Sequence, residues 1–347
     1  MKGLHLLKNT LNKKLWIGIG ISLFFLFLLF RKIDIAAFTS AFREMEYRYL
    51  WPAVGATFVS YFLRAVRWRF LLLPIKKTSM GNLFSATIIG YMANNLLPAR
   101  LGEFVRAYVL GTREGIGTSA VFATLVLDRL FDGFTVLLIL LITFFTVKLP
   151  PGMENVQHGL VVGGYVTLTL YVAVIVFLLF LKRQTSRTLA FTGWLLRPFP
   201  DRVAEKVIPL MGSFIQGLRL SSRPGELLAL LLSSLLIWAF AVWPVDLLLR
   251  SFGIVLPVTA SMFIMVFLVF AVMVPASPGY VGTYHAACVY GLMAFNIQKE
   301  KALSVALVIH GVSFFPVILA GFYCLWRENI SLADVSRRSS GQEASGD

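Results

Sequence analysis

Charge is scarce in this chain, and so are the residues that build disulfides, metal centres and nucleotide sites. Only 14% of the residues are charged, and the two cysteines, Cys288 and Cys324, lie in apolar stretches. They indicate neither a disulfide framework nor a metal site. The sequence has no P-loop, no Gly-x-Ser-x-Gly motif and no His/Cys/Asp cluster at metal-ligand spacing. These absences argue against an ATP-driven pump, and we expect no cofactor.

Apolar surface is what the chain has in excess. Hydrophobic residues make up 58% of the sequence and the mean hydropathy is +0.78, whereas soluble domains are about 45–50% apolar. One water-soluble core cannot hide this surface, so we expect an all-α polytopic membrane protein. The net charge of +15 is then explained by the positive-inside rule and by anionic lipid headgroups, rather than by nucleic acid.

Hydropathy predicts about six full spans and two interrupted apolar regions. The full spans are expected near 15–30, 50–73, 118–147, 159–181, 226–249 and 302–326. The interrupted regions are 82–112 and 257–296. We expect each to be a re-entrant hairpin of two broken helices that leaves the membrane on the side it entered. The alternative is that each region forms two thin spans, which leaves the flanking segments on the same sides of the membrane.

The positions of Lys and Arg predict the orientation. The N-terminal segment, the loop at about 182–225 and the C-terminal end are basic, so we expect all three on the cytoplasmic side of the cell inner membrane. The run 15–30 lacks a cleavage pattern and is interpreted as a retained anchor. We therefore expect one transmembrane domain over 1–330, an amphipathic cytoplasmic segment within 182–225, and a disordered cytoplasmic tail over 331–347.

Both interrupted regions contain the pattern Pro-Ala-x-x-Gly. Pro98 to Gly102 and Pro275 to Gly279 are offset by 177 residues, about half the chain length. The expected topology puts the two breaks on opposite sides of the membrane. This arrangement is typical of inverted repeats in transporters, whose broken helices face the substrate near the middle of the bilayer. Two kinked helices without a ligand are the alternative interpretation.

Ionisable residues inside apolar segments are costly in a bilayer and are candidates for function. Arg64 and Arg67 share a helix face in one span, and Asp128 and Asp132 share a face in another, with Arg129 beside them. Arg64 and Asp128 have similar expected depths. A structural ion pair between these two helices is as good an interpretation as a substrate site.

The breaks add further candidate site residues. Those of the first are Asn94, Asn95, Arg100, Glu103 and Arg106. Those of the second are Ser277, Gly279, Gly282, Thr283, Tyr284 and His285. The arginines of the first break suit a phosphate group, which guanidinium binds in bidentate geometry. A buried structural role is the favoured interpretation of His285, and coupling to pH is the alternative.

Taken in order, the motifs LRAVRWRFLL, NNLLPARLGEFVRAYVL, LDRLFDG and PASPGYVGTYH resemble the lysylphosphatidylglycerol synthase transmembrane region, also called the flippase-like domain family. The resemblance covers about residues 10 to 330. It implies an inner-membrane domain that translocates aminoacylated phosphatidylglycerol or other anionic or glycosylated lipids. Bifunctional members continue into an aminoacyl-transferase domain, but this chain ends soon after its last span, so lysyl transfer is not expected. The residues that match the family pattern are Arg64, Arg67, Asn94, Asn95, Pro98, Gly102, Glu103, Arg106, Asp128, Arg129, Pro275, Gly279 and Gly282.

These observations together predict a lipid translocase that is not an enzyme. Its headgroup site would combine the charged residues with the two breaks, and its partners would be membrane lipids. A homo-oligomer is compatible with the sequence. The alternatives are a secondary transporter of a small anion, a non-transporting partner in cell-envelope assembly, and an intramembrane enzyme that uses Asp128, Asp132 or His285.

Overall fold

The computed structural model describes residues 27, 35–97, 101–147, 154–197, 201–218, 223–273 and 278–328. Within these ranges the chain is helical and contains no strand, in agreement with the predicted all-α class. The predicted anchor at 15–30, apart from Phe27, and the predicted tail lie outside the described residues. Pro98, Arg100, Pro275 and Ser277 also lie outside them.

The longest helices have the composition of membrane helices. Among the described residues, three helices are long and apolar enough to cross a bilayer: α7 (Glu154–Arg183, from Val161 on), α10 (Pro224–Ser251) and α13 (Lys299–Arg327). They expose large apolar side chains such as Phe180, Leu235 and Leu319. Exposing these apolar side chains to water would cost free energy, whereas exposing them to lipid would not. The chain is therefore a multi-pass membrane protein.

Two stretches of the chain repeat the same order of elements. The first runs through α3 (Leu50–Leu72), α4 (Met80–Leu96), α5 (Gly102–Glu114) and α6 (Thr118–Thr146). The second runs through α10, α11 (Val258–Met273), the short 3-10 helix η3 (Pro278–Tyr280), α12 (Thr283–Met293) and α13. Each is a long helix, two short helices separated by a break, and a second long helix. We call α3–α6 the first half and α10–α13 the second half.

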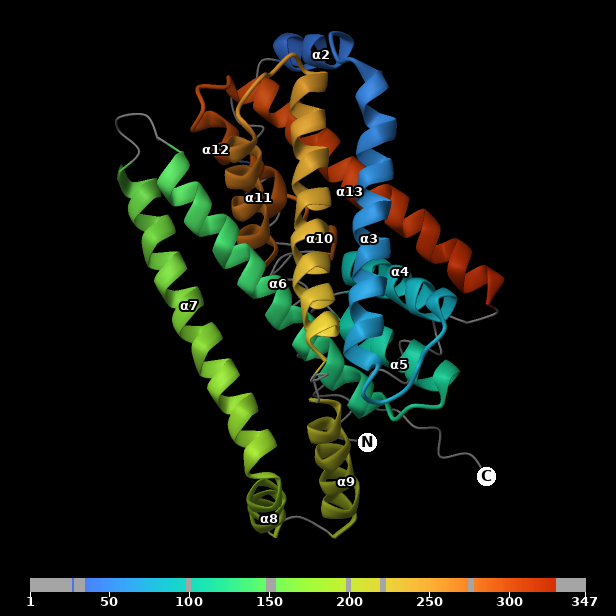
Figure 1. Ribbon diagram of the computed structural model, residues 1–347. Helices are drawn as coiled ribbons and strands as arrows, with labels where there is room; N and C mark the ends of the chain where they lie inside the picture. Colours follow the sequence, from blue (N-terminus) through green and yellow to red (C-terminus); the bar gives the residue numbers. More distant parts are fainter. Residues whose placement is uncertain are drawn as a thin grey trace.

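The two halves run in opposite directions. In Figure 1, α3 descends from the end near α2 (Ile35–Arg43) while α10 ascends beside it, and α6 ascends while α13 descends. Between α3 and α10, the Ser60 hydroxyl donates to the carbonyl of Ile237 at 3.0 Å, and these residues are 177 positions apart. That offset equals the distance between the two Pro-Ala-x-x-Gly patterns. The contact therefore joins equivalent positions, as expected where a pseudo-twofold axis passes between α3 and α10.

Each half has its own apolar core. In the first half, Trp68, Leu83, Ile89 and Leu110 are fully buried, and in the second half Ile264, Leu292 and Leu303 are. Proline at the first position of α10 and a left-handed Gly115 after α5 mark helix ends in the way these residues usually do.

The break in the first half depends on a close approach of two helices. A Cβ added to Gly102, at the start of α5, would lie 2.0 Å from the carbonyl oxygen of Gly90 on α4. Only glycine fits there, so α4 and α5 pack directly against each other. The predicted boundaries of the interrupted regions agree with α4, α5, α11 and α12.

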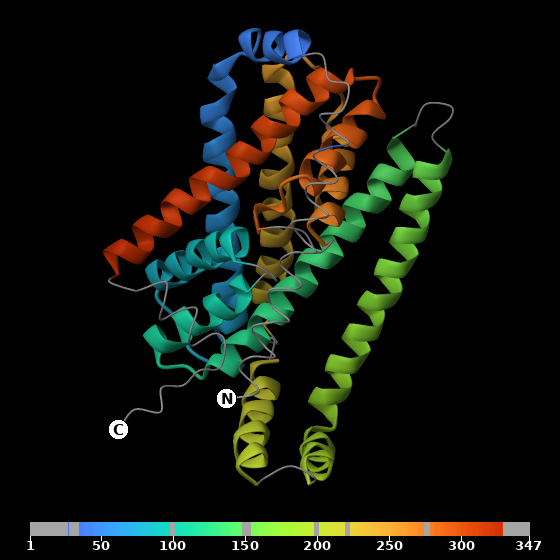
Figure 2. The same cartoon turned by 180° about the vertical axis from the view of Figure 1, so that it is seen from behind.

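A peripheral hairpin extends from the first half. After α6 the chain returns through α7 and continues into α8 (Thr185–Leu196) and α9 (Asp201–Gly217) at the lower end of the molecule (Figures 1 and 2). The segment predicted to be amphipathic is thus two helices. Phe191 and Trp194 on α8 and Leu210 on α9 are exposed.

Candidate functional site

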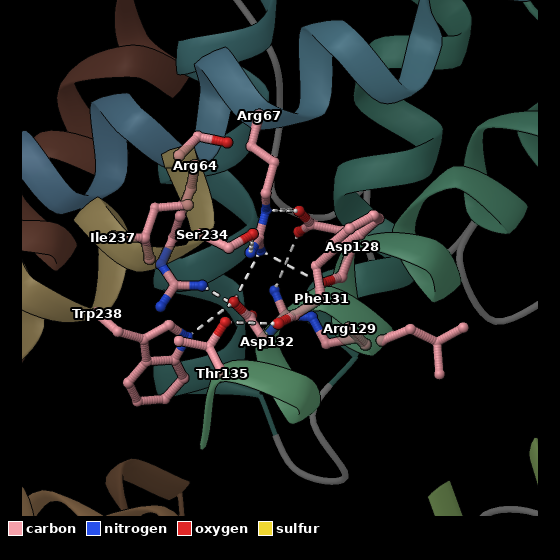
Figure 3. Close-up of polar contacts among 12 residues, drawn as sticks. Arg64, Arg67, Asp128, Arg129, Phe131, Asp132, Thr135, Ser234, Ile237 and Trp238 are labelled. Carbon is pink, nitrogen blue, oxygen red and sulfur yellow. Dashed lines mark hydrogen bonds and ion pairs between the residues drawn. The ribbon is translucent and has the colours of Figure 1, made fainter. Parts of the chain in front are cut away.

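A cluster of ion pairs joins α3 to α6 (Figure 3). Arg64 Nη1 lies 2.8 Å from Asp132 Oδ2, and Arg67 Nε lies 2.8 Å from Asp128 Oδ1. Arg67 Nη2 also reaches Asp132 Oδ1 at 2.7 Å. Arg67 and Asp128 are fully buried. The sequence-based candidates on these two helices are therefore brought together.

Ion pairs between these two helices were one of the two sequence-based interpretations, and the structure gives their register. Arg64 contacts Asp132, not Asp128, and Asp128 contacts Arg67. The reason is that α3 and α6 run in opposite directions (Figure 1). A residue one turn further along α3 therefore meets a residue one turn earlier on α6.

Arg106 enters the cluster from α5, the helix that follows the first break. Its Nη1 lies 3.2 Å from Asp128 Oδ2, and its guanidinium carbon lies 4.0 Å above the ring of Trp68. The side chain is 2% exposed. Its Nε and Nη2 have no hydrogen-bond partner in the described part of the chain. Buried donors without a partner are rare because each one costs free energy comparable to a lost hydrogen bond.

Arg129 forms the accessible edge of the cluster. Its Nη1 lies 3.2 Å from Asp132 Oδ2, its Nη2 donates to the Tyr91 hydroxyl at 2.9 Å, and its Nε lies 3.6 Å from Glu103 Oε1. The Arg129 side chain is 35% exposed, against 10% or less for Arg64, Arg67 and Arg106. A ligand that enters the cluster would meet Arg129 first.

Asn94 secures the break between α4 and α5. Its Oδ1 accepts from the backbone N–H of Gly102 at 2.8 Å, and its Nδ2 donates to Glu103 Oε2 at 3.0 Å. Asn94 thus holds both the start of α5 and the carboxylate that faces Arg129. Asn95, one position further on α4, contacts none of the charged side chains of the cluster.

The cluster carries an excess of positive charge. It contains four arginines (Arg64, Arg67, Arg106 and Arg129) and three carboxylates (Glu103, Asp128 and Asp132). Its formal charge is therefore +1. A buried net charge is unfavourable unless a counter-charge compensates it, so this arrangement favours the binding of an anion.

The second half contributes two residues that the sequence analysis missed. On α10, Ser234 accepts a hydrogen bond from Arg67 Nη1 at 3.1 Å, and Trp238 Nε1 donates to Asp132 Oδ1 at 3.3 Å (Figure 3). Their four-residue spacing within an otherwise apolar helix was the available signal, since it places a hydroxyl and an indole N–H on one face.

The described part of the second break packs against α4 of the first half, and Gly279 lies next to Phe314 of α13. The chain at Gly279, Tyr280 and Gly282 has positive φ angles of 75°, 55° and 94°. Thr283 Oγ1 donates to the carbonyl of Tyr280, and the Tyr280 hydroxyl donates to the carbonyl of Asn94 at 3.4 Å. The two breaks therefore touch.

Tyr284 and His285 of α12 lie against His310 of α13. Tyr284 stacks on His310 at 4.7 Å between ring centroids, and His285 lies against the same ring. Thr283, Tyr284 and His285 contact none of the four arginines. The predicted site is thus divided into a charged cluster in the first half and a histidine pair in the second.

A multi-pass helical membrane domain with two similar, oppositely directed halves and a buried arginine–carboxylate cluster is the class that fold and site define. The chain belongs to the family described as the lysylphosphatidylglycerol synthase TM region, which matches residues 15–321.

Curated relatives include a glycosyltransferase and two membrane proteins. A relative named Glycosyltransferase AglD, from Haloferax volcanii, is 26% identical over 309 residues, covering 81% of this chain and 49% of that protein. UPF0104 membrane proteins of Methanothermobacter thermautotrophicus and Pyrococcus horikoshii are each 25% identical, covering 81% and 91% of this chain and 86% and 97% of their own lengths. The chain spans about half of the Haloferax relative and most of the other two. No solved structure matches the chain significantly.

Proposed function

We propose that the protein translocates an anionic or glycosylated phospholipid across the cell inner membrane and catalyses no covalent step. The observation that carries this proposal is Arg106, whose buried Nε and Nη2 lack partners beside a cluster of formal charge +1. A phosphate oxygen would satisfy both nitrogens, since guanidinium binds phosphate in bidentate geometry. Asp128, Asp132 and Glu103 hold the arginines in place while no lipid is bound.

An apolar cavity on α6 favours a lipid over a small anion. The cavity has a volume of about 350 Å³, and its walls include Leu127, Phe131 and Phe134 of α6 and Leu178 of α7. Leu127 and Phe131 neighbour Asp128 and Asp132 in the sequence. A lipid could thus place its headgroup on the charged side of α6 and an acyl chain on the apolar side, with Lys182 at the rim of the cavity.

The arrangement of the halves supports a transport cycle. Oppositely directed repeats with broken helices allow alternating access by movement of one half against the other. In this proposal α4–α5 and α11–α12 are re-entrant hairpins, both termini are cytoplasmic, and Ser234 and Trp238 of α10 sense the occupancy of the cluster. A polar groove lowers the cost of moving a headgroup through hydrocarbon, where each unsatisfied polar group costs several kcal/mol.

The test is lipid movement in proteoliposomes, followed by dithionite quenching of headgroup-labelled anionic and glycosylated lipids. Native protein should accelerate quenching, and Arg106→Gln should slow it by about tenfold or more, the equivalent of roughly 1.4 kcal/mol or more. Arg113→Gln is the matched control, since Arg113 lies on the same helix but pairs with Glu328. It should keep the native rate.

Other outcomes would favour the alternatives. Uptake of labelled inorganic phosphate without lipid movement would indicate a transporter of small anions. If well-folded protein shows neither activity with several lipids, this result would indicate a partner in envelope assembly. The relative named a glycosyltransferase makes lipid-linked sugars the first glycosylated lipids to try.

A further inference from the structure

Two buried histidines form a hydrogen-bonded pair in the second half. His285 Nε2 on α12 lies 2.9 Å from His310 Nδ1 on α13. The residues are 4% and 9% exposed. The proposed lipid site uses neither histidine, yet the pair fixes the end of the second break to the last long helix.

The hydrogen bonds assign a tautomer to each ring. The backbone N–H of Gly282 donates to His285 Nδ1 at 3.3 Å, so that nitrogen carries no hydrogen. The hydrogen of a neutral His285 is then on Nε2, and it is donated to His310 Nδ1. The backbone of Gly279 lies near His310. Both rings are neutral in this arrangement.

The surroundings of the pair contain no fixed charge. Tyr284 stacks on His310 from α12, and Phe314 packs against it from α13. The ionisable groups nearby are Tyr284, Tyr61 and Cys288. In the described part of the chain, neither imidazole contacts a carboxylate, a lysine or an arginine.

An additional proton has no free acceptor in this chain of hydrogen bonds. On His285 Nδ1 it would face the N–H of Gly282, and on His310 Nδ1 it would face the hydrogen of His285 Nε2. Proton uptake must therefore break one of these two bonds. Because Gly282 and Gly279 hold positive φ angles next to the pair, either change loosens the second break.

One route of hydrogen bonds connects the pair to the arginine cluster. Along the backbone, the Tyr280 hydroxyl reaches the carbonyl of Asn94, whose side chain holds Glu103. A change at the pair is thus transmitted to the edge of the anion site.

We propose that His285 and His310 form a proton-binding site that couples proton movement to the opening of the anion site. One proton enters from water on one side, forms an imidazolium and leaves to the other side, so no further reactant is consumed. The inference rests on the proposed lipid translocation, because the proton gradient would supply its driving force.

The first measurement follows the imidazoles directly. Side-chain ¹⁵N spectra of the full chain in detergent, labelled at histidine, should show two neutral rings in fixed tautomers at neutral pH. On acidification one ring should become imidazolium as the Gly282 hydrogen bond opens. Exposed His158 serves as the reference signal. A pair that stays neutral throughout the range in which the protein is folded would overturn the inference.

The second measurement follows the lipid under a pH gradient. With one proton per lipid, a gradient of about one pH unit should shift the steady-state ratio of labelled lipid between leaflets by up to about tenfold. His310→Gln and His285→Asn should abolish the shift, and His285→Asn keeps an acceptor for the Gly282 N–H. His158→Gln should behave as native protein. Melting temperatures and gel filtration would confirm that the variants are folded.

The two measurements separate the inference from the proposed function. Rapid lipid exchange that ignores the gradient would leave the proposed function standing and overturn the inference. If native protein moves no lipid at any pH, the proposed function fails. The inference is then judged on the imidazole titration alone, where proton uptake at the pair supports it and its absence overturns it.

Discussion

The two halves of the molecule share a framework and differ in their chemistry. Both consist of a long helix, a broken pair of short helices and a second long helix, and Ser60 meets its equivalent Ile237 between them. At the same offset, Arg64 and Arg67 correspond to Ala241 and Pro244. The buried cluster of arginines and carboxylates lies in the first half, whereas the buried pair of neutral histidines lies in the second. The repeat thus determines where helices lie and leaves the polar side chains free to differ.

The largest expected effect is the loss of a carboxylate from the first half. Asp128→Asn leaves Arg67 and Arg106 buried without their shared counter-charge. We expect the free energy of unfolding in detergent to fall by about 3–5 kcal/mol. The matched change in the second half is Asp246→Asn, where the partner Arg250 reaches water, and we expect a loss of at most about 1 kcal/mol. Equal losses would contradict the proposed difference between the halves.

The two Pro-Ala-x-x-Gly patterns need their glycine for different reasons. Gly102→Ala would press a methyl group into the Gly90 backbone, and we expect a loss near 3 kcal/mol. Gly279→Ala mainly strains a residue at φ 75°, with an expected loss of about 1–2 kcal/mol.

Asparagine distinguishes the two explanations because it tolerates left-handed backbone better than alanine does. Gly279→Asn should therefore be less harmful than Gly279→Ala in denaturation experiments, whereas Gly102→Asn should be worse than Gly102→Ala. The same ranking at both glycines would refute this distinction.

A smaller expected effect than that of Asp128→Asn concerns the contribution of the second half to the cluster. Ser234→Ala removes one acceptor from Arg67, which keeps its contacts with Asp128 and Asp132. We expect a loss of about 1.5 kcal/mol in the free energy of unfolding. Ser233→Ala is the control, since that hydroxyl bonds only within its own helix. If both variants lose the same amount, α10 does not support the charged cluster.

The sequence predicted the helices better than the contacts between them. Apolar runs located α3, α6, α7, α10 and α13, and prolines and glycines located the breaks, because these signals are local. The candidates Arg64, Arg67, Glu103, Arg106, Asp128, Arg129 and Asp132 do form one cluster. The Arg64–Asp132 register, the roles of Ser234 and Trp238, and the His285–His310 contact depend on how helices far apart in sequence pack, which no local pattern records.

The Ser60–Ile237 contact also bears on how such a chain can arise. In a pair of identical half-length proteins inserted in opposite orientations, this position would meet its own copy, and every arginine would occur twice. Two copies of the same arginines, placed around the symmetry axis of the dimer, would repel each other. When the two halves are joined in one polypeptide, the sequence of each half can change independently of the other. A fused chain can therefore hold a charged cluster in one half and a histidine pair in the other. A symmetric dimer of identical subunits cannot.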